Sequence, residues 1–97
     1  MPYARARIFL RGLLNEAAMD IRLRIISPVK LLLDEMVDEV TLPGTLGPFV
    51  VLRNHAPIIS SLEQGEISYL REGERFSCPI SSGFVEVKDN VVCACVE

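Results

Sequence analysis

One histidine and three cysteines are the residues of this chain best suited to chemistry. His55, Cys78, Cys93 and Cys95 together offer four ligands of the kinds that zinc accepts. Cys93 and Cys95 are two residues apart in an apolar run, however, so both thiols point to one face of a strand. We expect that face, with Val91, to be the core face, where free cysteine commonly behaves as a small hydrophobic residue. The sequence therefore predicts no metal site and no cofactor.

A nucleophilic site would need a serine or cysteine within reach of His55 and a carboxylate to orient the ring. The serine candidates are Ser60, Ser61, Ser81 and Ser82. None of them stands in a nucleophile elbow, and no cysteine stands in a protease motif. We expect no catalytic site and a chain that is not an enzyme.

Two acidic pairs, Asp34-Glu35 and Asp38-Glu39, are the remaining candidates for acid and base catalysis. Neighbouring residues of a strand point to opposite faces, so neither pair converges on one substrate. We interpret them as a charged edge that discourages the addition of another strand.

The histidine lies in the stretch RNHAP, residues Arg53 to Pro57, between two apolar runs. Ala56 must be extended because a proline follows it, and Pro57 has no N–H to donate, so the turn is stiff. His55 has two interpretations: a pH switch that titrates near its unperturbed pKa of about 6.5, or part of a recognition turn. Stiffness and exposure favour recognition.

The elements around this turn are short and alternate with a period of two from Asp20 onwards. Eight to ten strands separated by ordinary turn residues indicate an all-β sandwich or barrel. Segment 29–42 is ambiguous. Its period of four fits an amphipathic helix, whereas its alternation fits a strand bent near Asp34 and Glu35.

Composition limits the partners. The chain has 97 residues, a net charge of −3 and no tryptophan, and its arginine-rich first 18 residues leave an acidic body. An acidic surface with few aromatics argues against nucleic acid. Three cysteines without C-x-x-C fit a reducing compartment, and no apolar run is long enough to span a membrane. We expect residues 1–18 to be a poorly ordered extension, with Met19 as the natural start, and residues 19–97 to be the single domain.

Two longer stretches resemble a known family. LPGTLGPFVVLRNHAPIISSLEQGEI and SSGFVEVKDNVVCACVE are similar to the epsilon subunit of rotary F-type ATP synthases, and MDIRLRIISP is similar to the start of such subunits. The HAP turn, the LPG before it and the later SGF turn occur in the order and spacing of that family. The resemblance covers Met19 to Glu97 and implies a flattened β-sandwich of about ten strands. It also implies a strand, and not a helix, for segment 29–42.

The resemblance implies a non-catalytic central-stalk subunit of a proton- or sodium-translocating ATP synthase, which helps couple rotation to ATP synthesis and hydrolysis. It implies that the gamma subunit is contacted by Ser27, Arg53, Asn54, His55, Ala56 and Pro57. It implies that the c-ring is faced by Pro43, Gly44, Thr45, Leu46, Gly47, Pro48 and Phe49. The expected location is peripheral, on the cytoplasmic face of a bacterial inner membrane. The family's helical hairpin would begin where these 97 residues stop.

Another class of function stays open from the residues alone: a free-standing β-sandwich that binds a peptide or a glycan. Scarce aromatic residues count against a glycan site. A small zinc or cysteine hydrolase is a third interpretation, and it depends on the ligands and nucleophiles discussed above.

Overall fold

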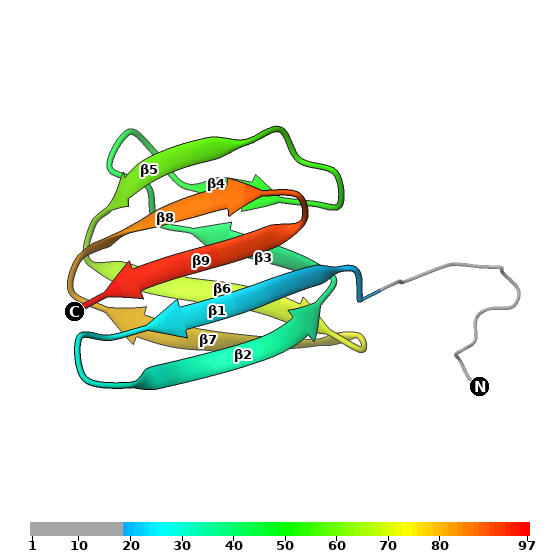
Figure 1. Ribbon diagram of the computed structural model, residues 1–97, viewed down its shortest axis with the longest axis horizontal. Helices are drawn as coiled ribbons and strands as arrows, with labels where there is room; N and C mark the ends of the chain where they lie inside the picture. The colour runs from blue at the N-terminus through cyan, green and yellow to red at the C-terminus, as the bar shows by residue number, and fades with distance from the viewer. Residues whose placement is uncertain (1–18) are drawn as a thin grey trace, which may run out of the picture.

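A computed structural model describes residues 19–97, so the predictions for residues 1–18 lie outside the described chain. The described residues form two packed sheets and no helix (Figure 1). The strands are β1 (Ile21–Ile26), β2 (Leu31–Val37), β3 (Glu39–Leu42), β4 (Phe49–Val51), β5 (Ile58–Leu62), β6 (Gly65–Arg71), β7 (Glu74–Ile80), β8 (Gly83–Lys88) and β9 (Val91–Val96). The predicted all-β sandwich is confirmed. No helix in this part of the chain is long and apolar enough to cross a bilayer.

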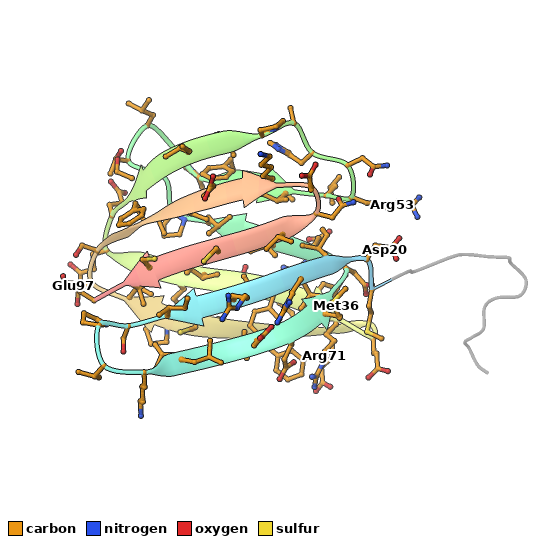
Figure 2. The ribbon with its side chains drawn as sticks, in the orientation of Figure 1. Asp20, Met36, Arg53, Arg71 and Glu97 are labelled. Carbon is orange, nitrogen blue, oxygen red and sulfur yellow. The ribbon has the colours of Figure 1, made fainter. Side chains whose placement is uncertain are left out.

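One sheet has the strand order β2-β1-β9-β8-β5, and the other has the order β4-β3-β6-β7. Every pairing is antiparallel except that of β1 with β9, which is parallel. Because β1 and β9 run in the same direction, Asp20 and Glu97 lie at opposite ends of the sandwich (Figures 1 and 2). These two ends carry different candidate sites.

The ambiguous segment is extended, as the family resemblance implies. The bend predicted near Asp34 and Glu35 is wrong, because the strand breaks at Asp38, where the chain passes from one sheet to the other. Val37 and Val40 are both fully buried, three residues apart. A strictly alternating strand cannot bury both, so the break at Asp38 resets the alternation.

The predicted core face of β9 is also wrong. Val92, Ala94 and Val96 are buried, whereas Cys93 and Cys95 are half-buried on the outer face. Both faces of this strand are apolar in sequence, so alternation alone could not decide which one is covered. The neighbouring strand decides it, since Val85 and Val87 of β8 point inward.

The core fills the space between the two sheets, and it is built from small and branched residues. Its buried members are Ile21, Leu23, Ile25, Val37, Val40, Leu42, Val51, Leu62, Ile67, Tyr69, Ile80, Val85, Val87, Val92, Ala94 and Val96. Two hairpins close with both central residues at positive φ, Glu72-Gly73 and Asp89-Asn90. This geometry matches the right-handed twist of the flanking strands.

Candidate functional site

The RNHAP turn connects β4 of one sheet to β5 of the other, at the Asp20 end of the sandwich. The Arg53 guanidinium donates to the Asp20 carboxylate at 2.9 Å. Figure 2 shows this pair at the end of the molecule away from Glu97. The turn is thereby tied to the residue just before β1.

A pair of asparagines fixes the turn further. The Asn54 N–H donates to Asn90 Oδ1 at 2.6 Å, and Asn90 Nδ2 donates back to Asn54 Oδ1 at 3.2 Å. Both residues have a φ of 64°, a conformation that asparagine tolerates better than most residues. Asn90 also accepts a hydrogen bond from the Arg22 N–H at its own carbonyl, at 2.9 Å. The turn is therefore attached to the β8–β9 hairpin.

His55 is half-buried, whereas its neighbours in the turn are exposed. Its N–H donates to the Leu52 carbonyl at 3.1 Å, and its Nδ1 lies 2.7 Å from the Ala56 carbonyl. A carbonyl can only accept, so Nδ1 carries the proton. The ring is thus oriented by its own turn, and Nε2 has no hydrogen-bond partner among residues 19–97.

The same end of the sandwich is acidic. Both carboxylate oxygens of Asp38 are shielded from solvent without a hydrogen-bond donor in the described part of the chain. Burial raises the pKa of Asp38, and the charges of Asp20, Glu39 and Glu72 act in the same direction. The Glu72 backbone amide opposes this shift in the Asp38 pKa without completing a hydrogen bond.

The loop Pro43 to Phe49 lies at the opposite end, beside β5. Gly44 forms an isolated bridge with Leu62, and Thr45 Oγ1 lies 2.6 Å from Ser61 Oγ. A Cβ on Gly44 would come within 2.7 Å of the Gly47 carbonyl oxygen, so this position requires glycine. The base of the loop is held closely to the sheet.

The tip of this loop is fully open. Leu46 has a relative exposure of 102%, the highest among the exposed large hydrophobic residues of the described chain. A single exposed apolar residue is ordinary on a surface, but this one stands on a fixed base. Such a residue can enter a partner's pocket with little loss of conformational freedom.

Ser27 does not lie near His55. It is in the turn between β1 and β2, at the end of the sandwich where the Pro43 to Phe49 loop also lies. Its hydroxyl accepts from the Lys30 N–H and donates to the Lys30 carbonyl, both at 3.2 Å. Ser27 has a structural role in closing that turn.

The enzyme-like candidates are not brought together. Cys78 is in β7 of one sheet, Cys93 and Cys95 are in β9 of the other, and His55 is in the turn at the Asp20 end. Within residues 19–97 no cluster of three or more histidine, cysteine or acidic side chains could hold a metal ion.

The candidate serines are also away from His55. Ser81 and Ser82 lie in the β7–β8 turn beside Glu97, at the opposite end of the sandwich. The Ser60 hydroxyl donates to the Ser61 carbonyl, and the Ser61 hydroxyl is hydrogen-bonded to the Thr45 hydroxyl. The described residues therefore offer two exposed, well-anchored loops and no assembled catalytic group.

Asp20 and Asn90 anchor the RNHAP turn, and neither role was predicted from the sequence. They are 33 and 36 residues from their partners Arg53 and Asn54. The sequence Asp89-Asn90 is a recognisable turn signal. The contact of Asn90 with the RNHAP turn depends on how the two sheets pack, which no local pattern shows.

Residues 20–97 match the family described as "ATP synthase, Delta/Epsilon chain, beta-sandwich domain". The ATP synthase epsilon chain of Trichlorobacter lovleyi is 41% identical over 80 residues, which are 82% of this chain and 58% of the relative. That of Geobacter metallireducens is 40% identical over the same shares. The chain thus spans 58% of the length of these curated relatives.

Solved structures agree. A chain of the Euglena gracilis mitochondrial ATP synthase matches with a TM-score of 0.76 and 26% identity, over 84% of this chain and 53% of that one. A chain of the Tetrahymena thermophila mitochondrial ATP synthase shares the fold, with a TM-score of 0.66, 16% identity and coverage of 79% and 63%. With its two-sheet topology and its match over residues 20–97, this chain belongs to the ATP synthase delta/epsilon family and contains that family's β-sandwich domain.

Proposed function

We propose that this chain acts as a non-catalytic part of the central stalk of an ATP synthase and that its two anchored loops bind different partners. The observation that carries the proposal is that RNHAP and the Pro43 to Phe49 loop lie at opposite ends of one sandwich. A subunit that connects two other parts of an assembly needs two such surfaces.

The gamma subunit is the partner that we propose for the RNHAP turn. Arg53, Asn54, Ala56 and Pro57 are exposed, and the His55 ring is held by the Ala56 carbonyl. A turn that is already ordered loses little entropy when it binds. Ser27 lies at the other end of the sandwich, so in this proposal it forms a separate part of the gamma contact.

The c-ring is the partner that we propose for the Pro43 to Phe49 loop. Leu46 supplies the apolar contact, and Gly44 and Thr45 hold the base of the loop on β5. In this arrangement the protein is peripheral to the membrane. The bacterial relatives support a place on the cytoplasmic face of the inner membrane.

Binding of the purified 97-residue chain to gamma, alone and in a gamma–c-ring assembly, tests both assignments. We expect His55→Ala to weaken binding to gamma alone by about tenfold or more, as for a central interface residue. We expect Leu46→Ser to leave that binding unchanged and to weaken binding to the assembly.

Ser77→Ala is the matched control, because Ser77 is an exposed residue in the middle of β7, away from both loops. Urea unfolding verifies that each variant is folded. If the folded wild-type chain fails to bind gamma, the stalk function is refuted. If it binds but His55→Ala binds equally well, the RNHAP assignment alone is refuted.

A further inference from the structure

Two thiols stand side by side on the outer face of the five-stranded sheet. Cys93 and Cys95 alternate with buried Val92 and Ala94, so both point away from the core. Both are half-buried and unbonded to any other cysteine. Neither thiol is among the proposed stalk contacts, although Ser27, which belongs to the proposed gamma contact, lines the same groove as Cys95.

The strand register defines the surroundings of each thiol. Cys95 is flanked by Ile26 of β1 and Phe84 of β8, and it lines an open groove with these two residues. Cys93 is flanked by Arg24 of β1 and Glu86 of β8. One thiol therefore has apolar neighbours and the other has charged neighbours.

This arrangement does not favour a disulfide within the strand. Residues i and i+2 of a strand are about 6.6 Å apart at Cα. Their Cα–Cβ bonds are parallel, so the two Cβ atoms are about as far apart as the two Cα atoms. A disulfide requires Cβ atoms about 3.5–4.5 Å apart. A bridging metal ion with two bonds to sulfur of about 2.3 Å spans about 4.6 Å, which side-chain rotation can meet. The spacing of the two thiols thus suits a two-coordinate metal ion better than a disulfide.

Arg24 supplies a matching charge. Its Nε is shielded from solvent and has no hydrogen-bond acceptor among residues 19–97, although it forms an ion pair with Asp34 Oδ2 at 3.5 Å. Burial raises the pKa of Cys93, the Cys95 thiol and the Glu86 charge add to this shift, and the Arg24 charge opposes it. A bis-thiolate complex of a monovalent cation carries one negative charge, and Arg24, which lies directly across from Cys93 and shares its charge with Asp34, is the neighbouring cation. A thiolate sulfur is also an acceptor for the unpartnered N–H.

We propose that Cys93 and Cys95 form a two-coordinate site for a thiophilic monovalent cation of the Cu(I) and Ag(I) class. Each thiol releases its proton to solvent, two sulfur–metal bonds form, and the ion keeps its oxidation state. Soft thiolates select such ions. Zinc needs four ligands, and no third metal-binding side chain joins this pair in the described chain.

Anaerobic titration of the full, reduced chain with Cu(I), in competition with a Cu(I) chelator, tests the site. We expect one Cu(I) per monomeric chain, and we expect Cys93→Ser and Cys95→Ser each to lower the affinity by on the order of 100-fold. Cys78→Ser is the matched control, because Cys78 lies on the other sheet, and it should bind like the wild type.

Alkylation of the wild-type chain provides a readout that needs no variant. Saturating Cu(I) should protect Cys93 and Cys95 from iodoacetamide and leave the reactivity of Cys78 unchanged. Equal affinity of the wild type and a doubly substituted Cys93→Ser, Cys95→Ser chain would overturn the proposal. So would protection of Cys78 alone, or one ion shared between two chains.

Discussion

Replacing Asn90 tests whether the RNHAP turn is held in place by its hydrogen bonds to the β8–β9 hairpin. Asn90→Ala removes the oxygen that accepts from the Asn54 N–H and the amide that donates to Asn54 Oδ1. It also places alanine at a φ of 64°, which asparagine adopts more readily. Asn90→Gly removes the same two hydrogen bonds but adopts that φ without steric cost.

The two variants separate the two contributions to the free energy of unfolding. Exposed hydrogen bonds contribute about 0.5 kcal/mol each at the low end of the usual range, so the pair contributes about 1 kcal/mol. The left-handed conformation adds about 1 kcal/mol for alanine. We expect Asn90→Ala to lose about 2 kcal/mol and Asn90→Gly about 1 kcal/mol.

Urea unfolding followed by circular dichroism measures both values, and gamma binding gives the functional consequence. Because a loosened turn must be ordered again on binding, we expect both variants to bind gamma several-fold more weakly. Asp89→Gly is the control, at the adjacent hairpin position with a φ of 52°, and it should stay within about 0.5 kcal/mol of the wild type. If both Asn90 variants unfold at the wild-type urea concentration, the asparagine pair does not hold the turn.

Three further predictions concern the remainder of the sandwich. Asp38→Asn should stabilise the protein at pH 7 by on the order of 0.5 kcal/mol and have no effect near pH 3.5. The reason is that the Asp38 pKa is raised in the folded state, so the wild type loses stability as the pH rises through this pKa. A series of urea midpoints measured at different pH values will detect the difference. Gly83→Ala should destabilise by about 3 kcal/mol or more in the same assay, because its Cβ would come within 2.3 Å of the Cys95 carbonyl oxygen, whereas a small change would mean that β8 and β9 can separate. The Arg22 hydrogen bond lowers the pKa of Asp34, so the stability that this bond provides is present at neutral pH and is lost as the pH falls through that pKa. In Asp34→Asn the free energy of unfolding should therefore depend less on pH in the acid range. An unchanged pH dependence would contradict this.

The strand content of this fold was predictable because its turns are explicit in the sequence. Asp89, Asn90 and Gly73 occupy hairpins with positive φ, as aspartate, asparagine and glycine commonly do, and Glu72 adopts the same region beside Gly73. Segment 29–42 was not decided by periodicity, because acids four residues apart fit a helix as well as a strand. The family resemblance implied a strand, and packing, which buries Val37 and Val40 on either side of Asp38, gives the physical reason.

The candidate site was predictable in part. The stiffness of RNHAP follows from Pro57, and the glycines of the other loop are a local signal. The separation of Ser27 from His55 follows from the direction of β1 and β5 in the sheet, which no local pattern reveals. Similarly, the outward direction of Cys93 and Cys95 depends on which face of an all-apolar strand meets the second sheet.

The parallel pairing of β1 with β9 has a consequence for the chain as it leaves the ribosome. Among the described strands β1 is translated before all others and can pair with β2 at once, whereas its other neighbour, β9, follows the seven strands in between. Until β9 emerges, β1 and β8 both present open edges, while all four strands of the other sheet, from Glu39 to Ile80, are already available. Exposed edges recruit strands from other chains. Folding of this sequence during translation therefore passes through a half-closed sandwich, and insertion of β9 covers the open edges of β1 and β8.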